Sequence, residues 1–398
     1  MVIRRFRNSV LSLMAKVHEL SREPYAHPEF AADIQFELIG RIKYVERRIR
    51  RWKARTATDE TAWEAVEQYR RVLALFRMIG DCIAFLYIDR WDVKPLAYGH
   101  DPGFISGKKG LAQELKILRL ASARKIPCLL ADLTNVLRHG DLYAFSPERP
   151  PAILEIKSPL ARKDQRTKRQ VERLNNLTEF LTTDFSSKHY KRGNPTYRIG
   201  WSDSPTYHTG EARALLSEGI QTGLAVREVE PGLRYAVVRP HRLNHLDQII
   251  HGMETPVASL LNDGALNLDC YAYYPLLLSI PDPENVFRLF TWEILFLVLV
   301  DIDRIRTFYE ERNIGFEFHY DADDDYVVAL TFPAGTTQLD SDLPVQVSRY
   351  FFGRICCEFL SFRNWLEQSV KTAEQWTLSR HKRMSSNSAL HPISDSDG

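Results

Sequence analysis

Apolar residues in the first 90 positions recur at the spacing of amphipathic helices. Residues 1–20 carry the first stripe, residues 30–55 the second and residues 61–88 the third. The second stripe alternates steps of four and three, at Leu38, Ile42, Val45, Ile49 and Trp52. Because Pro95 and a glycine- and proline-rich segment then break the period, the pattern predicts a helical arm over residues 1–95.

Strand-length apolar runs replace the helical period further along the chain. The runs 140–145 and 153–158 are separated by residues 146–151, whose Pro and Ser residues break both patterns. This arrangement predicts a β-hairpin with a six-residue loop. A helix is expected before the hairpin over residues 110–124, and another after it over residues 164–182.

Charged residues interrupt the second strand of this hairpin. Side chains alternate along a strand, so Glu155 and Lys157 share one face, and Leu154 and Ile156 share the other. Charges on an apolar strand are expensive to bury without partners, and Asp141 opens the neighbouring strand. Two carboxylates and a lysine at one strand end predict a site for a hard divalent cation. The alternative is a surface hairpin with an ordinary Glu–Lys face.

The order of these residues resembles the active-site signature of the PD-(D/E)XK nuclease superfamily over residues 105–240. The resemblance implies that Asp141 and Glu155 hold the metal with the backbone carbonyl of Ile156. It implies that Lys157 orients or deprotonates the attacking water. It further implies that Glu114, on the helix before the hairpin, is an additional acidic ligand and that Gln170, on the helix after it, supports Lys157 or the water.

The resemblance also sets an expectation for the fold. It implies an α/β chain whose restriction-endonuclease-like core, a mixed sheet flanked by helices, spans residues 96–240. Gly140 departs from the family, which often has Pro there, and Leu174 departs from the members with a Gln-x-x-x-Tyr pattern. For Glu114 the alternative is an exposed carboxylate on a helix surface.

Basic residues gather near the predicted site, although the formal net charge of the chain is only +2. Any nucleic-acid footprint must therefore be local. The candidates for nucleic-acid contact are Arg138, His139, Arg162, Lys163, Arg166, Lys168 and Arg169. A histidine before a strand can instead form a local hydrogen bond, and a basic run can be a solvated helix start. The same two alternatives, a solvated face or phosphate contact, apply to the Arg- and Lys-rich face of residues 41–55.

Several classes of site and segment are excluded by the residues themselves. The five cysteines contain no Cys-x-x-Cys pair, which argues against zinc and favours a reducing cytoplasm. Gly107-Lys108 lacks the rest of a phosphate-binding Walker loop. The apolar run 294–300 is much shorter than the ~20 residues of a spanning helix, so no membrane association is expected. We expect that run to lie in a buried helix over residues 284–311.

The remaining chain carries no catalytic grouping. Residues 224–228 and 233–238 predict a hairpin that completes the core sheet. Residues 241–378 predict an α+β accessory region, a candidate surface for a protein partner or for a second copy of the chain. Residues 379–398 are polar and predict a disordered tail.

Together these patterns predict a nuclease that uses Mg²⁺ or Mn²⁺ to hydrolyse phosphodiester bonds of nucleic acid. DNA is favoured over RNA as its partner. By resemblance, the expected role is anti-phage defence or DNA processing. The alternative is a non-catalytic, nuclease-like module that binds DNA or scaffolds a protein partner.

Overall fold

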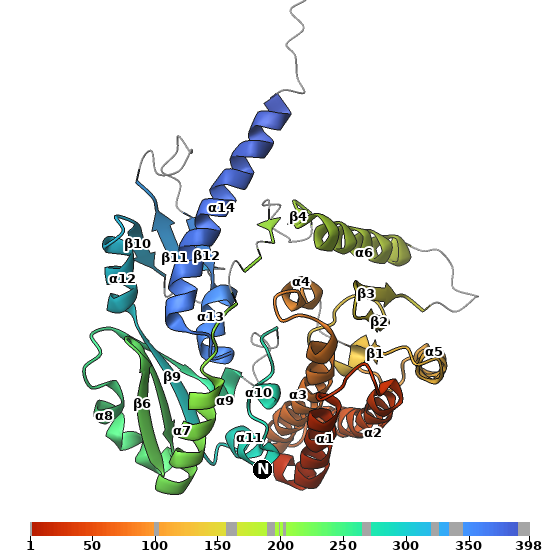
Figure 1. Cartoon of the computed structure of the whole chain (residues 1–398). Helices are drawn as coiled ribbons and strands as arrows, with labels where there is room; N and C mark the ends of the chain where they lie inside the picture. The colour runs from red at the N-terminus through yellow and green to blue at the C-terminus, as the bar shows by residue number, and fades with distance from the viewer. Residues whose placement is uncertain are drawn as a thin grey trace, which may run out of the picture.

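The computed structural model of the chain forms two lobes joined side by side (Figure 1). It describes residues 2–98, 103–156, 165–188, 196–198, 200–201, 204–264, 272–319, 326–333 and 345–388. The N-terminal lobe, residues 2–198, combines long helices with a three-stranded and a two-stranded sheet, and the C-terminal lobe, residues 204–388, contains two further sheets. Most buried apolar residues form one cluster that runs through both lobes, and a second, small cluster lies in the C-terminal lobe.

The N-terminal lobe contains the helices that the apolar stripes predict. Its helical elements are η1 (Val2–Phe6), α1 (Arg7–Leu20), α2 (Pro28–Lys53), α3 (Thr61–Tyr87), α4 (Val93–Ala97), α5 (Leu111–Ala123), η2 (Ala131–Leu133) and α6 (Gln165–Thr183). Its strands are β1 (Cys128–Leu130), β2 (Leu142–Ser146), β3 (Arg149–Leu154), β4 (Phe185–Ser186) and β5 (Thr196–Tyr197).

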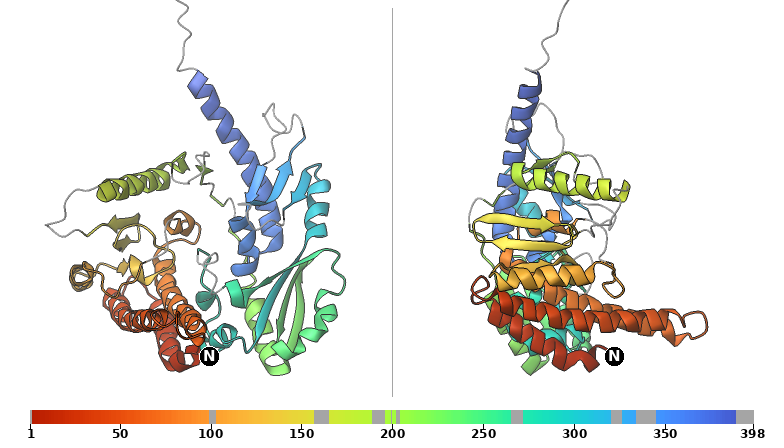
Figure 2. Two further views of the ribbon diagram at one scale, coloured as in Figure 1. Left: turned by 180° about the vertical axis from the view of Figure 1, so that it is seen from behind. Right: turned by 90° about the vertical axis from the view of Figure 1, so that its right-hand side faces the viewer.

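Helices α2 and α3 form a long antiparallel pair that extends to one side of the molecule (Figure 2). The stripe predicted on α2 is its buried face, since Leu38, Ile42, Val45 and Ile49 are all fully buried. Burial of such side chains contributes about 1.5–3 kcal/mol each to folding. The heptad-like spacing is therefore confirmed as a packing pattern between two helices.

The N-terminal helices are part of the same lobe as the hairpin and not a separate arm. Strands β1, β2 and β3 pair in that order, all antiparallel, and no other described strand pairs with the second edge of β1. Gln35 of α2 covers that edge: its amide donates to the Cys128 carbonyl at 2.8 Å and accepts from Leu130 N at 3.0 Å. Gln35 is fully buried. Helix α2 thus satisfies backbone groups that would otherwise cost free energy to bury.

The predicted hairpin is present, but its connection is shorter than expected. β3 begins at Arg149, so only Pro147 and Glu148 join the strands instead of six residues. Proline lacks a backbone N–H and is tolerated at a sheet edge, which is how Pro150 and Pro151 fit into β3. β2 is mostly buried, whereas β3 is an edge strand whose side chains are exposed or half-buried.

The C-terminal lobe contains the remaining helices and strands of the chain that the structure describes. Its helices are α7 (Thr209–Thr222), η3 (Pro240–His245), α8 (Leu246–Ile250), α9 (Leu261–Gly264), α10 (Leu276–Ser279), α11 (Pro283–Phe290), α12 (Ile302–Glu310), α13 (Arg349–Cys357) and α14 (Phe362–Ser388). Its strands are β6 (Leu224–Glu230), β7 (Leu233–Val238), β8 (Pro256–Leu260), β9 (Leu295–Asp301), β10 (Gly315–Phe318), β11 (Tyr326–Thr331) and β12 (Val345–Ser348).

The apolar run 294–300 is a strand, so the helix expected over residues 284–311 is wrong. β9 lies inside a four-stranded sheet of order β6-β7-β9-β8 and is buried along most of its length. A strand covered on both faces is apolar throughout and shows no period of two, which is why the run resembles a buried helix. Trp292, at φ +59°, ends the helical stretch before it. No helix among the described residues has the length and apolarity needed to cross a membrane.

The sheets differ from the single mixed sheet that was expected. The hairpin of β6 and β7 is confirmed, but β7 pairs with β9 instead of completing the sheet of β1–β3. The boundary expected at residue 240 therefore falls within one sheet. Every strand pair among the described residues is antiparallel. The fold is thus a combination of helices with several antiparallel sheets.

The last helix, α14, projects from the C-terminal lobe (Figures 1 and 2). It continues to Ser388, so the disordered tail expected from residue 379 is wrong for its first part. The rest of that segment lies outside the described residues.

Candidate active site

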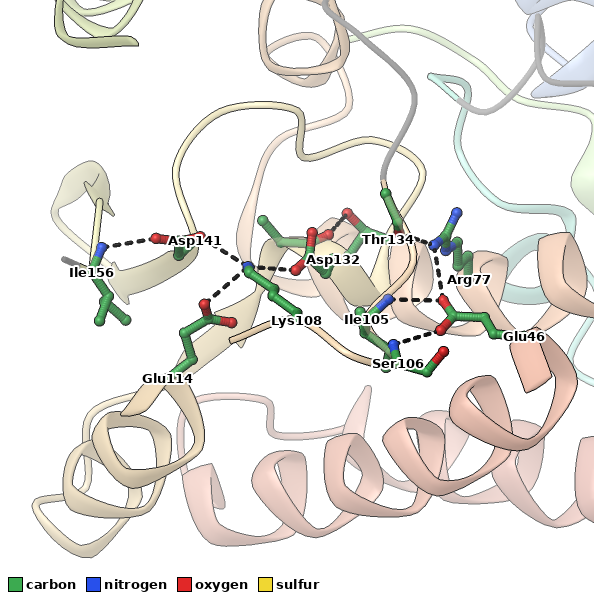
Figure 3. A network of polar contacts seen from close by, with 12 residues as sticks. Glu46, Arg77, Ile105, Ser106, Lys108, Glu114, Asp132, Thr134, Asp141 and Ile156 are labelled. Atoms are coloured by element: carbon green, nitrogen blue, oxygen red, sulfur yellow. Dashed lines mark hydrogen bonds and ion pairs between the residues drawn. The ribbon is translucent and has the colours of Figure 1, made fainter. Parts of the chain in front are cut away.

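Three carboxylates from separate elements meet at the side chain of Lys108 (Figure 3). Lys108 Nζ lies 2.9 Å from Glu114 Oε1, 2.6 Å from Asp132 Oδ2 and 2.9 Å from Asp141 Oδ1. Two of these acids, Glu114 and Asp141, are residues that the sequence predicts as metal ligands. The structure therefore brings them together, with a lysine ammonium between them.

The pairing of β1 with β2 explains why Asp132 and Asp141 are neighbours. Leu130 pairs with Leu142 at the end of the ladder, so the residues just after β1 lie beside those just before β2. Ala131 N donates to the Asp141 carbonyl at 3.0 Å and extends this pairing by one step. Asp132 follows directly in η2, and both side chains reach Lys108.

Glu114 reaches the cluster from the first turn of α5. It is 2% exposed and lies on the inward face of the helix with Leu111 and Leu118. The alternative of an exposed helix carboxylate is therefore wrong. Burial raises the pKa of Glu114, against the opposing hydrogen bond from Lys108. An ionised carboxylate buried to this degree is costly without a cation or hydrogen-bond donors beside it, and Lys108 supplies both to Glu114.

Asp141 links the cluster to the end of β3. Its backbone N–H donates to the Leu154 carbonyl at 2.8 Å, and its Oδ2 accepts from Ile156 N at 2.8 Å. Glu155 lies between these two contacts and is half-buried. β3 ends at Leu154, so Glu155 and Ile156 follow the strand instead of belonging to it. Lys157 lies outside the described residues.

Gly140 has a structural reason to differ from proline. It adopts φ +68°, whereas a proline ring fixes φ near −65°. A Cβ atom at this position would lie 2.6 Å from Ile153 Cγ2 and 3.0 Å from the Leu154 carbonyl oxygen. The chain passes so close to β3 here that glycine is required, and this proximity places Asp141 against Ile156.

The segment that carries Lys108 is held by buried polar side chains of α2 and α3. Glu46, fully buried, accepts from Ile105 N at 3.0 Å and Ser106 N at 2.7 Å. Arg77 donates to the Gly103 carbonyl at 2.7 Å and lies 3.6 Å from Glu46. Figure 3 shows this network beside the carboxylate cluster. The backbone before Lys108 is thus fixed by charged groups buried in the helical pair.

The charges of the cluster keep Lys108 protonated. Burial pulls the pKa of Lys108 down, but Asp132 and the hydrogen bonds to Glu114 and Asp141 outweigh it and raise the pKa above its ordinary value. The ammonium is therefore a permanent cation at neutral pH. It satisfies three acids at once, of which Glu114 is the most deeply buried.

The predicted nucleic-acid contacts near the hairpin are only partly described. His139 is buried and its Nε2 lies 3.0 Å from the Tyr98 carbonyl, which favours a local hydrogen bond over phosphate contact. Arg138 is half-buried, and its charge offsets a small part of the burial that raises the pKa of Asp81. Arg169 is exposed on α6. Arg162 and Lys163, and the side chains of Arg166, Lys168 and Gln170, lie outside the described part of the chain.

The basic face of residues 41–55, on α2 and just after it, divides into two groups. Arg48 donates to the Tyr69 hydroxyl at 3.1 Å, and Arg50 donates to the Ser106 carbonyl. These two therefore support the fold. The other basic side chains of this face that are exposed are Arg41, Arg47, Arg51, Lys53 and Arg55. Their exposure is compatible with both a solvated face and phosphate contact.

Sequence reasoning missed Lys108 and Asp132 as members of the site. Lys108 was considered only as part of a phosphate-binding loop, and that motif is incomplete. A signal for Asp132 existed, because it directly follows the strand-length apolar run 128–131, which precedes the strand that Asp141 opens. No comparable signal existed for Lys108, whose position depends on Glu46 and Arg77 far away in sequence.

Comparisons with known proteins gave no relative: no family model, no curated protein and no solved structure matches this chain. The site must therefore be interpreted from its own geometry. In the part of the chain that the structure describes, no group of three His, Cys, Asp or Glu side chains is disposed to hold a metal ion as it stands. The described cysteines, Cys82, Cys128, Cys356 and Cys357, are free thiols.

Proposed function

We propose that the protein is a metal-dependent nuclease with a restriction-endonuclease-like site, acting on DNA in preference to RNA. The observation that supports this most is the convergence of Glu114, Asp132 and Asp141 on one cation position. Two of the three belong to the order of residues that resembles the PD-(D/E)XK signature. Glu155, the third acid of that order, follows β3 directly beside the Asp141 contact to Ile156.

The donor set suits Mg²⁺ or Mn²⁺ in its chemistry. Hard divalent cations take carboxylate oxygens, and the three acids already surround a positive group, the Lys108 ammonium, at hydrogen-bond distance. Asp141, Glu114 and Asp132 would hold the ion, and Glu155 would join them. Such an ion lowers the pKa of bound water and stabilises charge that develops on a phosphate.

The chain's own residues would do the rest. Asp141 is oriented by the Ile156 N–H and by its own backbone link to Leu154, so its carboxylate is fixed before any ligand arrives. Lys157 would take the proton of the attacking water, and Gln170 would orient it, as the resemblance implies. Exposed basic residues such as Arg169 would contact the phosphate backbone.

One observation favours a second candidate function. The Lys108 ammonium already neutralises part of the acidic cluster, so the site holds together without any added cation. A nuclease-like module that binds DNA or a protein partner without cutting would have the same geometry. The two candidates differ in whether phosphodiester bonds are broken.

Cleavage assays on the full chain test the proposal. Linear, circular and single-stranded DNA and RNA are incubated with Mg²⁺, Mn²⁺ or EDTA, using wild type, Lys157→Ala, Asp141→Asn and the matched control Lys109→Ala, whose side chain is exposed. We expect metal-dependent cutting that falls about 100-fold or more in the first two variants and is unchanged in Lys109→Ala.

Two results would contradict this proposal. Cutting that survives both Lys157→Ala and Asp141→Asn would indicate another site or a contaminant. DNA binding without cutting under every metal condition would favour the non-catalytic module.

A further inference from the structure

The Lys108 ammonium is surrounded by more negative charge than it can neutralise. One positive group faces three carboxylates, and the Glu114 side chain is only 3% exposed. Arg77 also acts electrostatically on Asp132, but its guanidinium is already committed to Glu46 and the Gly103 carbonyl. A divalent ion at the same point would balance the three acids better than a single ammonium does.

The ammonium can leave this point without a change of fold. The backbone that precedes Lys108 is anchored at Gly103, Ile105 and Ser106 by Arg77 and Glu46, and none of these contacts involves the lysine side chain. Gly107, at φ +91°, turns the chain so that Lys108 points into the cluster. The Lys108 side chain is 27% exposed, so its flexible stem has access to water.

We propose that Lys108 is a tethered cation that holds the metal position in the ion-free protein and is displaced when a divalent ion binds. This inference rests on the proposed function, because it concerns the same carboxylates. It assigns Lys108 a positioning role: the ammonium keeps Glu114, Asp132 and Asp141 together before the ion arrives. The same contact weakens ion binding, since the ion must compete with the lysine for its ligands.

The test is Mn²⁺ binding to the full chain, measured by the loss of the free-ion signal in electron paramagnetic resonance. Wild type is compared with Lys108→Met and with the neighbouring, exposed Lys109→Met, which makes the same charge change outside the cluster. We expect Lys108→Met to bind Mn²⁺ about tenfold tighter or more, and Lys109→Met to bind within about twofold of wild type.

A second readout separates this role from a purely structural one. Without metal, Lys108→Met should unfold at a lower temperature than wild type because three carboxylates then repel each other, and saturating Mn²⁺ should restore most of that loss. A lysine that only stabilises the fold would produce the loss without tighter ion binding. Mn²⁺ affinity that is unchanged or weaker in Lys108→Met would overturn the inference.

If Lys108→Met does not fold, an NMR titration of the wild-type protein tests the displacement of Lys108. The ¹⁵Nζ resonance of Lys108 is followed by NMR during a Mg²⁺ titration: the protected ammonium signal should disappear as the ion binds. A signal that persists at saturating Mg²⁺, or no Mg²⁺ binding, would overturn the inference.

The two proposals fail in different ways. Tighter Mn²⁺ binding in Lys108→Met without any DNA cleavage would keep this inference and reject the nuclease. Cleavage that needs Lys157, together with unchanged Mn²⁺ binding in Lys108→Met, would support the nuclease and reject the displacement of Lys108.

Discussion

At the scale of single residues, buried carboxylates tie the helical pair to the segments that carry the site. Asp81 of α3, 2% exposed, accepts hydrogen bonds from Asn135 N at 2.6 Å, Asn135 Nδ2 at 2.8 Å and Val136 N at 3.0 Å. Asn135 and Val136 lie between Asp132 and Asp141. Asp81 thus holds the connection between two acids of the cluster, as Glu46 holds the segment before Lys108.

Asp81 should make the stability of the protein depend on pH. Burial raises its pKa from 3.8 to about 7, against the three hydrogen bonds that favour the charged form. Between these values the folded state binds a proton that the unfolded state has lost, so stability falls as pH rises through this window. Asp81→Asn stays neutral. Its free energy of unfolding should therefore rise by on the order of 4 kcal/mol relative to that of wild type as the pH increases from about 4 to about 8.

Urea unfolding of wild type and Asp81→Asn at several pH values checks this prediction. The control is Asp33→Asn, which makes the same substitution at an exposed position of α2. A constant difference between wild type and Asp81→Asn across the range would show that Asp81 does not titrate in this window.

At the scale of elements, the hairpin of β2 and β3 is positioned by its close approach at Gly140. Gly140→Ala should cost about 1–3 kcal/mol, because the new Cβ meets Ile153 at 2.6 Å and the backbone is left-handed. Gly103→Ala is the matched control, since nothing lies within 4 Å of its Cβ position, and it should change stability by less than about 0.5 kcal/mol. Urea midpoints of the two variants measure the difference, and equal midpoints would contradict the prediction.

The elements that the sequence predicts best are those whose pattern reflects one buried face. Helices α2 and α3 follow from their stripes, and β2 with β3 follows from two short runs separated by proline. β9 does not, because it is buried on both faces and an apolar run without a period fits a helix equally well. The edge position of β3 was also not predictable, since edges depend on which strands assemble.

At the scale of the whole molecule, a buried ion pair lies at the junction of the lobes. Arg354 of α13 donates to Glu358 at 2.9 Å and to the Arg90 carbonyl of the N-terminal lobe at 2.9 Å, and its guanidinium lies 3.6 Å from the centre of the Trp91 ring. Glu358, fully buried, accepts from Tyr274 N at 2.8 Å. This charged pair therefore links the two lobes, in addition to the apolar cluster that runs through both.

Removing one partner of this pair should destabilise the protein more than removing both. Arg354→Leu leaves the buried Glu358 carboxylate with only the more distant Arg90 guanidinium, at 3.8 Å, among its described cations. It should cost about 3–5 kcal/mol, and Arg354→Leu with Glu358→Leu should recover part of that loss. Arg363 and Glu367 provide a control with the same spacing and the same 2.9 Å contact on an exposed surface, where Arg363→Leu should cost less than about 1 kcal/mol.

Urea unfolding followed by tryptophan fluorescence measures this cycle. If Arg354→Leu costs no more than Arg363→Leu, the junction does not depend on the buried charge. If the double variant is no more stable than Arg354→Leu, the loss comes from the packing of Arg354 on Trp91 and not from an unpaired Glu358.

The sequence by itself determined the amphipathic helices of the N-terminal lobe, the β2–β3 hairpin and the expectation that Glu114 and Asp141 belong to one site. The helices and the hairpin depend on periods and turns that are local in the chain, whereas the expectation of a shared site rests on the resemblance. Only the tertiary structure decided that β9 is a strand and that Lys108 is the partner of the acids. Lys108 is 24 residues from Asp132 and 33 from Asp141. The partners of a charged side chain depend on which segments lie close together in the fold. Here the pairing of β1 with β2 places Asp132 beside Asp141, and Glu46 and Arg77 hold the segment before Lys108 next to them.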